Sequence, residues 1–213
     1  MNRRRFDAVA WDIDGTLVDS EPLHHRALVA VSAGFGVDLS DLAEQAFRGV
    51  HMNDVWRILR PRWPSDLDER DWLDAINDWY VSHCAALVAV EGARKTVTSL
   101  ARRGVPQVCV SNSSRSVVDA NLEALGVDGI VAFSISLDDV AAGKPDPEPY
   151  ARAAKRLAIE PQQLVAVEDS PSGARSAHDA GLFVVGFSPT RSVSDDCDMV
   201  VDRLNDILEL FNS

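Results

Sequence analysis

The sequence contains no long apolar stretch. Among its 213 residues, no apolar run approaches the roughly 18 residues that a membrane-spanning helix needs. Cysteine is scarce as well, because Cys84, Cys109 and Cys197 are too few and too scattered for a disulfide framework or a zinc site. Internal repeats and low-complexity linkers are also lacking. These absences exclude a membrane-spanning chain, a disulfide-stapled domain and a disordered or collagen-like chain.

Positively charged residues are fewer than negatively charged ones. Lysine and arginine number 21 against 33 aspartates and glutamates, which gives a formal net charge of −12. Such a surface repels nucleic acid and anionic lipid, so we expect neither as a partner. The acidity is best explained by solubility. The first residues are basic, but Asp7 follows and no apolar signal region comes after it, so we expect no secretory signal and a cytoplasmic location.

What the sequence does contain is typical of a globular protein, with 46% hydrophobic and 25% charged residues. Short apolar runs without strict alternation indicate strands that are buried on both faces. They lie at residues 6–11, 105–110, 130–135, 164–167 and 182–187. Helical spacing of apolar residues appears between or after them, at residues 150–158 and 204–211. This alternation predicts an α/β fold with a Rossmann-like parallel sheet covered by helices.

One segment interrupts the alternation. Residues 24–87 show helical patterns and no convincing strand, and they hold four of the five tryptophans. We therefore predict two domains, a core made of residues 1–19 and 88–213 and an inserted all-helical cap of residues 20–87. In open α/β sheets ligands bind beyond the carboxyl ends of the strands, so an insert here would cover the site. The tryptophans are expected to form the insert's own core rather than to contact substrate.

The strongest chemical signal follows the first predicted strand. Asp12 and Asp14 stand two residues apart, and Gly15 comes next. A buried unpaired carboxylate is costly, and two close together repel each other, so a divalent cation would resolve both problems. The turn through Gly15 and Thr16 could present backbone N–H groups to an anion. The alternative is an ordinary Asp-Gly turn at a strand end.

Four ordered motifs make the chain resemble the haloacid dehalogenase-like hydrolase superfamily. Residues 12–17 match its first motif, Asp-x-Asp-Gly-Thr/Val-Leu/Ile. Ser111 after an apolar run matches the second, Lys144 in Gly-Lys-Pro-Asp-Pro the third, and the acidic pair at 168–169 the fourth. The resemblance covers essentially the whole chain and implies a Rossmann-like core with an alpha-helical cap. Taken singly, each motif also fits a helix cap or a loop charge.

The resemblance implies a role for each motif. Asp12 would be the nucleophile that forms an aspartyl-phosphate, which splits one hard step into two. Asp14 would protonate the leaving alkoxide and later deprotonate water. Ser111 and the N–H of Asn112, at the start of the following helix, would hold phosphoryl oxygens. Lys144 would neutralise the nucleophile and the phosphoryl charge.

The same resemblance implies a Mg²⁺ site. Its ligands would be the Asp12 carboxylate, the backbone carbonyl of Asp14 and the Asp169 carboxylate, with Glu168 beside the ion or bound through water. Oxygen ligands and water are the coordination that Mg²⁺ prefers. Because dehalogenases of the superfamily lack the second aspartate and need no metal, the presence of Asp14 favours phosphate chemistry.

The segment that follows, residues 19–24, resembles the subgroup of beta-phosphoglucomutase and small sugar-phosphate phosphatases. His24 matches a cap-hinge histidine of the mutase, and residues 47–50 resemble the cap segment that reaches the substrate. The resemblance therefore implies that His24, Arg48 and Gly49 help to bind substrate, although an exposed histidine and a solvated arginine fit the sequence equally well. In the mutase two cap cations fall where this chain has Met52 and Ile76, and a mutase must hold a second phosphate in its cap. Nearby cations, Arg48 among them, could substitute for the two.

We therefore predict a Mg²⁺-dependent phosphatase that hydrolyses a small phosphorylated metabolite, of the sugar phosphate or phosphoglycolate type, through an aspartyl-phosphate. One alternative is a beta-phosphoglucomutase-type isomerase. The other is a catalytically idle protein that binds phosphorylated ligands, because fold alone does not fix function. The substrate's identity and the oligomeric state stay open.

Overall fold

The computed structural model describes residues 6–47, 50–188 and 195–212. The chain divides into two compact units. We call Met1–Asp19 together with Ala89–Ser213 the core unit, and Ser20–Val88 the helical unit. In the described part of the chain, no helix combines the length and the apolar character needed to cross a membrane.

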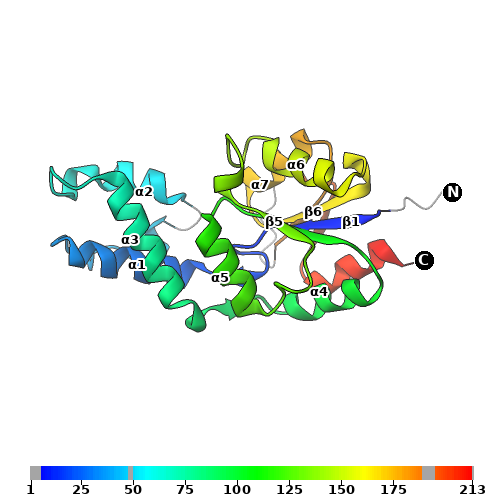
Figure 1. The fold of residues 1–213 in the computed structure, drawn as a ribbon, viewed down its shortest axis with the longest axis horizontal. Helices are drawn as coiled ribbons and strands as arrows, with labels where there is room; N and C mark the ends of the chain where they lie inside the picture. Colours follow the sequence, from blue (N-terminus) through cyan, green and yellow to red (C-terminus); the bar gives the residue numbers. More distant parts are fainter. Residues whose placement is uncertain (1–5, 48–49, 189–194, 213) are drawn as a thin grey trace. The chain divides into compact units, whose positions relative to one another are not determined.

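The core unit is built on a six-stranded parallel sheet, which confirms the predicted α/β class. Its strand order is β5-β4-β1-β6-β7-β8, so the N-terminal strand lies next to a strand from far along the chain (Figure 1). The strands are β1 (Ala8–Trp11), β4 (Gln107–Val110), β5 (Phe133–Ile135), β6 (Leu164–Glu168), β7 (Phe183–Phe187) and β8 (Met199–Val201). Every residue of β1, β4 and β6 is buried, as expected of strands covered on both faces.

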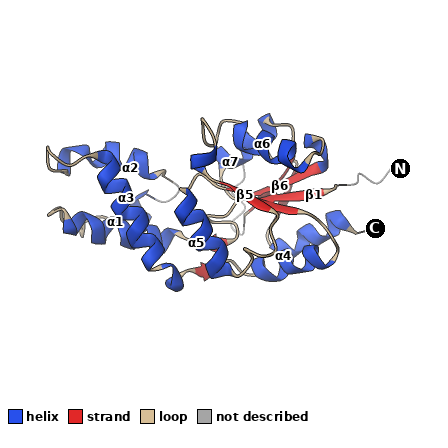
Figure 2. Cartoon of the chain, in the orientation of Figure 1, coloured by secondary structure: helices blue, strands red, loops and turns tan. Residues whose placement is uncertain are grey.

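Helices flank this sheet on both sides, with α6 and α7 on one side and α4 on the other (Figure 2). Small alanines of α6 and α7 let these helices pack closely against β1, β4 and β6. The helices of the core unit are α4 (Ala93–Arg102), α5 (Arg115–Leu125), α6 (Glu148–Leu157) and α7 (Pro171–Asp179). Short 3₁₀ helices are η4 (Leu137–Asp139), η5 (Pro161–Gln163) and η6 (Leu204–Phe211).

Two details of the core unit differ from the sequence prediction. The segment predicted as a regular helix near residue 204 is the 3₁₀ helix η6, in which Leu204 and Ile207 are buried. Strand β8 was not predicted, because it has only three residues and Val200 in its middle is exposed. Its strand character comes from pairing with β7, which no local pattern reveals.

The helical unit contains α1 (Glu21–Gly34), η1 (Glu44–Phe47), α2 (Met52–Leu59), η2 (Arg60–Arg62), α3 (Glu69–Ser82) and η3 (Cys84–Ala86). Its core contains Trp56, Trp63 and Trp72, which are buried and whose ring centroids lie 5.3–5.5 Å apart. These three rings pack on one another, which is the core role expected of them. The fourth tryptophan, Trp79, is only partly buried and stacks on His83. Two short strands, β2 (Val18–Asp19) and β3 (Val88–Ala89), pair where the chain passes between the units. That this unit acts as a cap stays a prediction.

Candidate active site

The predicted catalytic side chains of the core unit come from loops at one edge of its sheet. Asp12 directly follows β1, Ser111 directly follows β4, and Asp169 directly follows β6. Because β4, β1 and β6 are neighbouring parallel strands, their carboxyl ends meet at the same edge. Residues that are far apart in the sequence thereby come together.

Lys144 is the centre of a buried charged cluster. Its Nζ lies 2.7 Å from Asp12 Oδ1, 2.5 Å from Glu168 Oε1 and 2.9 Å from the carbonyl oxygen of Val110. These bonds use all three donors of the ammonium group. The side chain is only 3% exposed, so water screens the two ion pairs very little.

Burial and mutual repulsion set the protonation of this cluster. Burial raises the pKa of Asp12 well above its usual range, although Lys144 opposes the rise. Burial by itself would lower the pKa of Lys144, but Asp12 and Glu168 raise it above its ordinary value, so this lysine stays charged. Burial, with the neighbouring charge of Glu168, raises the pKa of Asp169 to about 7.

The acidic residues of this cluster fit a hard divalent cation. Carboxylate oxygens of Asp12, Glu168 and Asp169 all lie within 4.8 Å of one another. Asp12 Oδ2 is buried and has no hydrogen-bond partner, and such an orphaned acceptor is costly. A cation with oxygen ligands would both satisfy this atom and offset the repulsion among three carboxylates.

Two glycines make room for the acidic pair. Gly15 has a φ of +89°, and a Cβ built on it would lie 2.0 Å from Asp169 Oδ2. A Cβ on Gly173 would lie 1.9 Å from Glu168 Oε2. Real Cβ atoms do not approach so closely, so only glycine at these positions leaves both carboxylates where they are.

Asp14 turns its carboxylate toward α5 and the loop before it. Its Oδ2 accepts hydrogen bonds from Ser111 Oγ and Ser113 Oγ, each at 3.0 Å, and its Oδ1 accepts one from Asn121 Nδ2 at 3.1 Å. The Ser111 oxygen in turn accepts the Ser113 N–H at 3.0 Å. The predicted hydrolase motif thus brings Ser111 and Asp14 into direct contact.

Asn112 does not occupy the position expected of it. Helix α5 begins at Arg115 and Ser114 precedes it, so the prediction that Asn112 starts this helix was wrong. The hydrogen bond from the Ser113 N–H to Ser111 Oγ stabilises a non-helical turn in this loop, so the helix begins only after it. The Asn112 amide instead fixes the loop of Lys144, donating to its carbonyl at 2.9 Å and accepting its N–H at 2.7 Å.

The other predicted binding residues are described one by one. The Gly15 N–H donates to the carbonyl of Val18 at 2.8 Å, so the turn itself uses this group instead of offering it to an anion. Thr16 is fully buried. His24 belongs to the helical unit, where its ring stacks on Tyr80 with centroids 4.4 Å apart. The predicted residues Arg48 and Gly49 lie outside the described residues.

Three residues of the cluster were not predicted from the sequence: Ser113, Asn121 and Tyr150. The Tyr150 hydroxyl donates to Glu168 Oε1 at 2.5 Å, and Lys144 Nζ lies 5.2 Å from the centre of its ring. The sequence pattern places Tyr150 on an apolar helix face, and such a pattern does not reveal the hydrogen bond that its hydroxyl makes. Asn121 could have been noticed, because it is a polar residue at core-facing spacing in α5.

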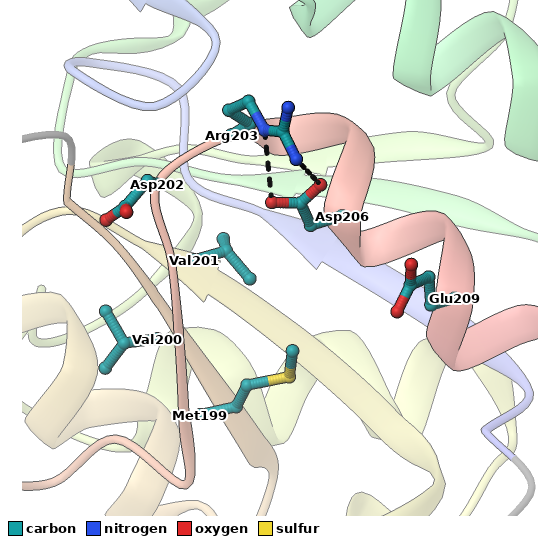
Figure 3. Close-up of a pocket in the computed structure, with 7 residues that line it drawn as sticks. All are labelled: Met199, Val200, Val201, Asp202, Arg203, Asp206 and Glu209. Carbon is teal, nitrogen blue, oxygen red and sulfur yellow. Dashed lines mark hydrogen bonds and ion pairs between the residues drawn. The ribbon is translucent and has the colours of Figure 1, made fainter.

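Two pockets of the core unit lie away from these residues. One lies beside the edge strand β8 and η6, where Arg203 pairs with Asp206 at 3.1 Å (Figure 3). Another is lined by Ile135, Asp139, Arg152 and Arg156. Neither contains a predicted site residue, so the acidic cluster at the sheet edge is the better candidate for chemistry.

Comparison with known proteins assigns the family. Residues 6–181 match the family model described as a haloacid dehalogenase-like hydrolase. The chain belongs to this family. It is 29% identical to validoxylamine A 7'-phosphate phosphatase of Streptomyces hygroscopicus subsp. limoneus over 87% of each chain. It is 27% identical to hexitol phosphatase A of Escherichia coli, with 95% of this chain and 94% of that protein covered.

A solved structure of the same family superposes on nearly the whole chain. It is a variant of CbbY from Rhodobacter sphaeroides in complex with xylulose-(1,5)bisphosphate, with a TM-score of 0.86 and 26% identity. The match covers 98% of this chain and 100% of that one. The haloacid dehalogenase-like hydrolases related to this chain thus include sugar-phosphate phosphatases and a protein that binds a sugar bisphosphate.

Proposed function

We propose that this haloacid dehalogenase-like hydrolase is a Mg²⁺-dependent phosphatase that acts on a small phosphorylated metabolite of the sugar phosphate or phosphoglycolate type. One observation carries the proposal. The two oxygens of Asp12 have different surroundings: Oδ1 is bound by Lys144, whereas Oδ2 is buried without a partner beside two further carboxylates. A carboxylate that a buried lysine holds at one oxygen, with its other oxygen open to a metal ion, suits a nucleophile.

In the first step the Asp12 carboxylate attacks phosphorus. The new Asp12–phosphorus bond forms as the bond from phosphorus to the substrate's ester oxygen breaks, and that oxygen takes a proton from Asp14. Lys144 keeps the attacking carboxylate oriented and offsets the charge that gathers on the phosphoryl oxygens. Phosphoryl transfer depends chiefly on such positioning and charge neutralisation.

In the second step water attacks the aspartyl-phosphate. Asp14, deprotonated by the first step, takes a proton from this water, which releases inorganic phosphate and restores the Asp12 carboxylate. The Ser111 hydroxyl and the loop fixed by Asn112 lie on the Asp14 side, where they would bind phosphoryl oxygens.

Asp12, Glu168 and Asp169 would hold the metal ion, together with the Asp14 carbonyl that the sequence implies. When bound, Mg²⁺ supplies positive charge at the phosphoryl oxygens and relieves the repulsion among these acids. The residues His24, Arg48 and Gly49 remain proposed substrate contacts.

The helical unit supports hydrolysis over isomerisation. Ile76, which stands where the mutase has a cap cation, is buried in that unit's own core. Met52 begins α2, and the nearby Arg57 is paired with Asp54 at 2.5 Å. A bisphosphate intermediate would therefore lack two of the charged contacts that a mutase uses.

The test is phosphate release from a panel of phosphorylated metabolites with Mg²⁺. We expect release from at least one sugar phosphate or phosphoglycolate, an acid-stable phosphoenzyme in the wild type, and loss of both in Asp12→Asn. Activity that persists in Asp12→Asn without a trapped intermediate would overturn the mechanism. Beta-glucose 1-phosphate converted mainly to glucose 6-phosphate, with stimulation by glucose 1,6-bisphosphate, would instead identify an isomerase. No turnover of any ester would identify an idle binding protein.

A further inference from the structure

The Asp14 carboxylate accepts more hydrogen bonds than the phosphatase proposal requires. Three hydroxyl or amide donors converge on its carboxylate: Ser111 and Ser113 from the loop after β4, and Asn121 from α5. We propose that Ser113 and Asn121 are positioning residues, which hold the Asp14 carboxylate in place for proton transfer. This inference rests on the proposed acid–base role of Asp14.

Asn121 places a polar side chain at a buried position of an apolar helix face. It is fully buried in the middle of α5, on the same face as the buried Val117, Val118, Leu122 and Leu125. A buried amide is destabilising unless its hydrogen bonds are made. A leucine would continue this apolar face. The Asn121 amide donates to Asp14 Oδ1 at 3.1 Å, which accounts for a polar residue at this position.

Ser111 explains why further donors are needed. A hydroxyl has one proton to donate. In this structure Ser111 donates this proton to Asp14 Oδ2. In the proposed phosphatase reaction the same hydroxyl would donate it to a phosphoryl oxygen. When phosphate takes the Ser111 proton, Ser113 still holds Oδ2 and Asn121 still holds Oδ1.

This arrangement holds the Asp14 carboxylate in one orientation and still allows it to donate or accept a proton. One donor on each oxygen defines the plane of the carboxylate, as a bidentate pair does. Each carboxylate oxygen also has a second lone pair, so a proton can be delivered or accepted while both donors stay bound. Ser113 and Asn121 therefore act on the reaction through Asp14.

The test compares leaving groups. Asn121→Leu and Ser113→Ala are measured beside Asp14→Asn, with an alkyl phosphate and with p-nitrophenyl phosphate in pre-steady-state experiments. p-Nitrophenolate hardly needs a proton, so its burst should change less than about 3-fold. Phosphorylation by the alkyl ester should fall roughly 10- to 100-fold in Asn121→Leu, the loss expected for one hydrogen bond to a charged group. Ser116→Ala, an exposed hydroxyl of α5, is the matched control and should change neither rate.

A double-mutant cycle separates positioning from general damage. On the Asp14→Asn background, Asn121→Leu should lower the alkyl rate by less than about 3-fold, because no carboxylate is left to position. Equal losses with both leaving groups, or the same loss on the Asp14→Asn background, would overturn the inference. If Asn121→Leu does not fold by circular dichroism, Ser113→Ala at its partly exposed site decides the question by the same criteria.

The two proposals can fail separately. If Asp14→Asn leaves the ratio of alkyl to aryl rates unchanged, the acid–base assignment fails and the inference fails with it. If Asp14→Asn lowers that ratio but both positioning variants keep the wild-type value, the inference alone is wrong.

Discussion

Replacing Gly173 by alanine is a sharp test of the packing beneath the acidic cluster. Gly173 lies in the first turn of α7, and an added Cβ would lie 1.9 Å from Glu168 Oε2 and 2.1 Å from its Oε1. Those contacts are impossible, so the Glu168 carboxylate must move. Helix propensity alone predicts the opposite outcome, because alanine stabilises a helix by about 1 kcal/mol relative to glycine.

The magnitude follows from the bonds that the carboxylate would lose. Glu168 Oε1 accepts hydrogen bonds from Lys144 Nζ and from the Tyr150 hydroxyl, each at 2.5 Å. Each bond to a charged group is worth about 1.5–3 kcal/mol, so losing both costs about 3–6 kcal/mol. After subtraction of about 1 kcal/mol of helix propensity, Gly173→Ala should lower the free energy of unfolding by about 2–5 kcal/mol.

The assay is urea denaturation in EDTA, followed by Mg²⁺ titration of the folded variant by calorimetry. Gly129→Ala is the matched control, because Gly129 lies in the same unit and an added Cβ would meet nothing within 4 Å. That control should be neutral or stabilising by up to about 1 kcal/mol. A Gly173→Ala protein as stable as the wild type, with unchanged Mg²⁺ affinity, would refute the reasoning.

Three further changes test the same cluster. Tyr150→Phe keeps the ring under Lys144 but removes one bond to Glu168, so urea denaturation should show a loss of about 1–3 kcal/mol, and no loss would contradict that bond. Asp169→Ala should raise the Mg²⁺ concentration needed for half-maximal phosphate release, because it removes an anionic ligand; an unchanged requirement would remove Asp169 from the metal site. Because the folded-state pKa of Asp169 is raised to about 7, its contribution to metal-free stability is present near pH 4 and is lost as pH rises toward 7. In EDTA, Asp169→Asn should therefore gain stability relative to the wild type over this range, and a gain that shrinks as pH rises would show the sign to be wrong.

The sheet and the edge at which the catalytic residues lie follow from local patterns in the sequence. Apolar runs such as 164–167 lack alternation, and only a strand covered on both faces tolerates that pattern. A carboxylate directly after such a run must lie at the strand's carboxyl end. The positions of Asp12 and Asp169 in the sequence therefore assign both to one edge of a parallel sheet.

The hydrogen-bond partners of the polar side chains, in contrast, depend on how the strands and helices assemble. Periodicity reports the face on which a residue lies, but not the partner of its hydroxyl or amide. Tyr150 and Asn121 both sit at core-facing positions of helices, and their contacts with Glu168 and Asp14 arise because β1, β4 and β6 are adjacent in the sheet although distant in the chain. The start of α5 at Arg115 depends likewise on the hydrogen bond within the loop before it. A local pattern does not contain such long-range pairings, because they exist only once the strands have assembled.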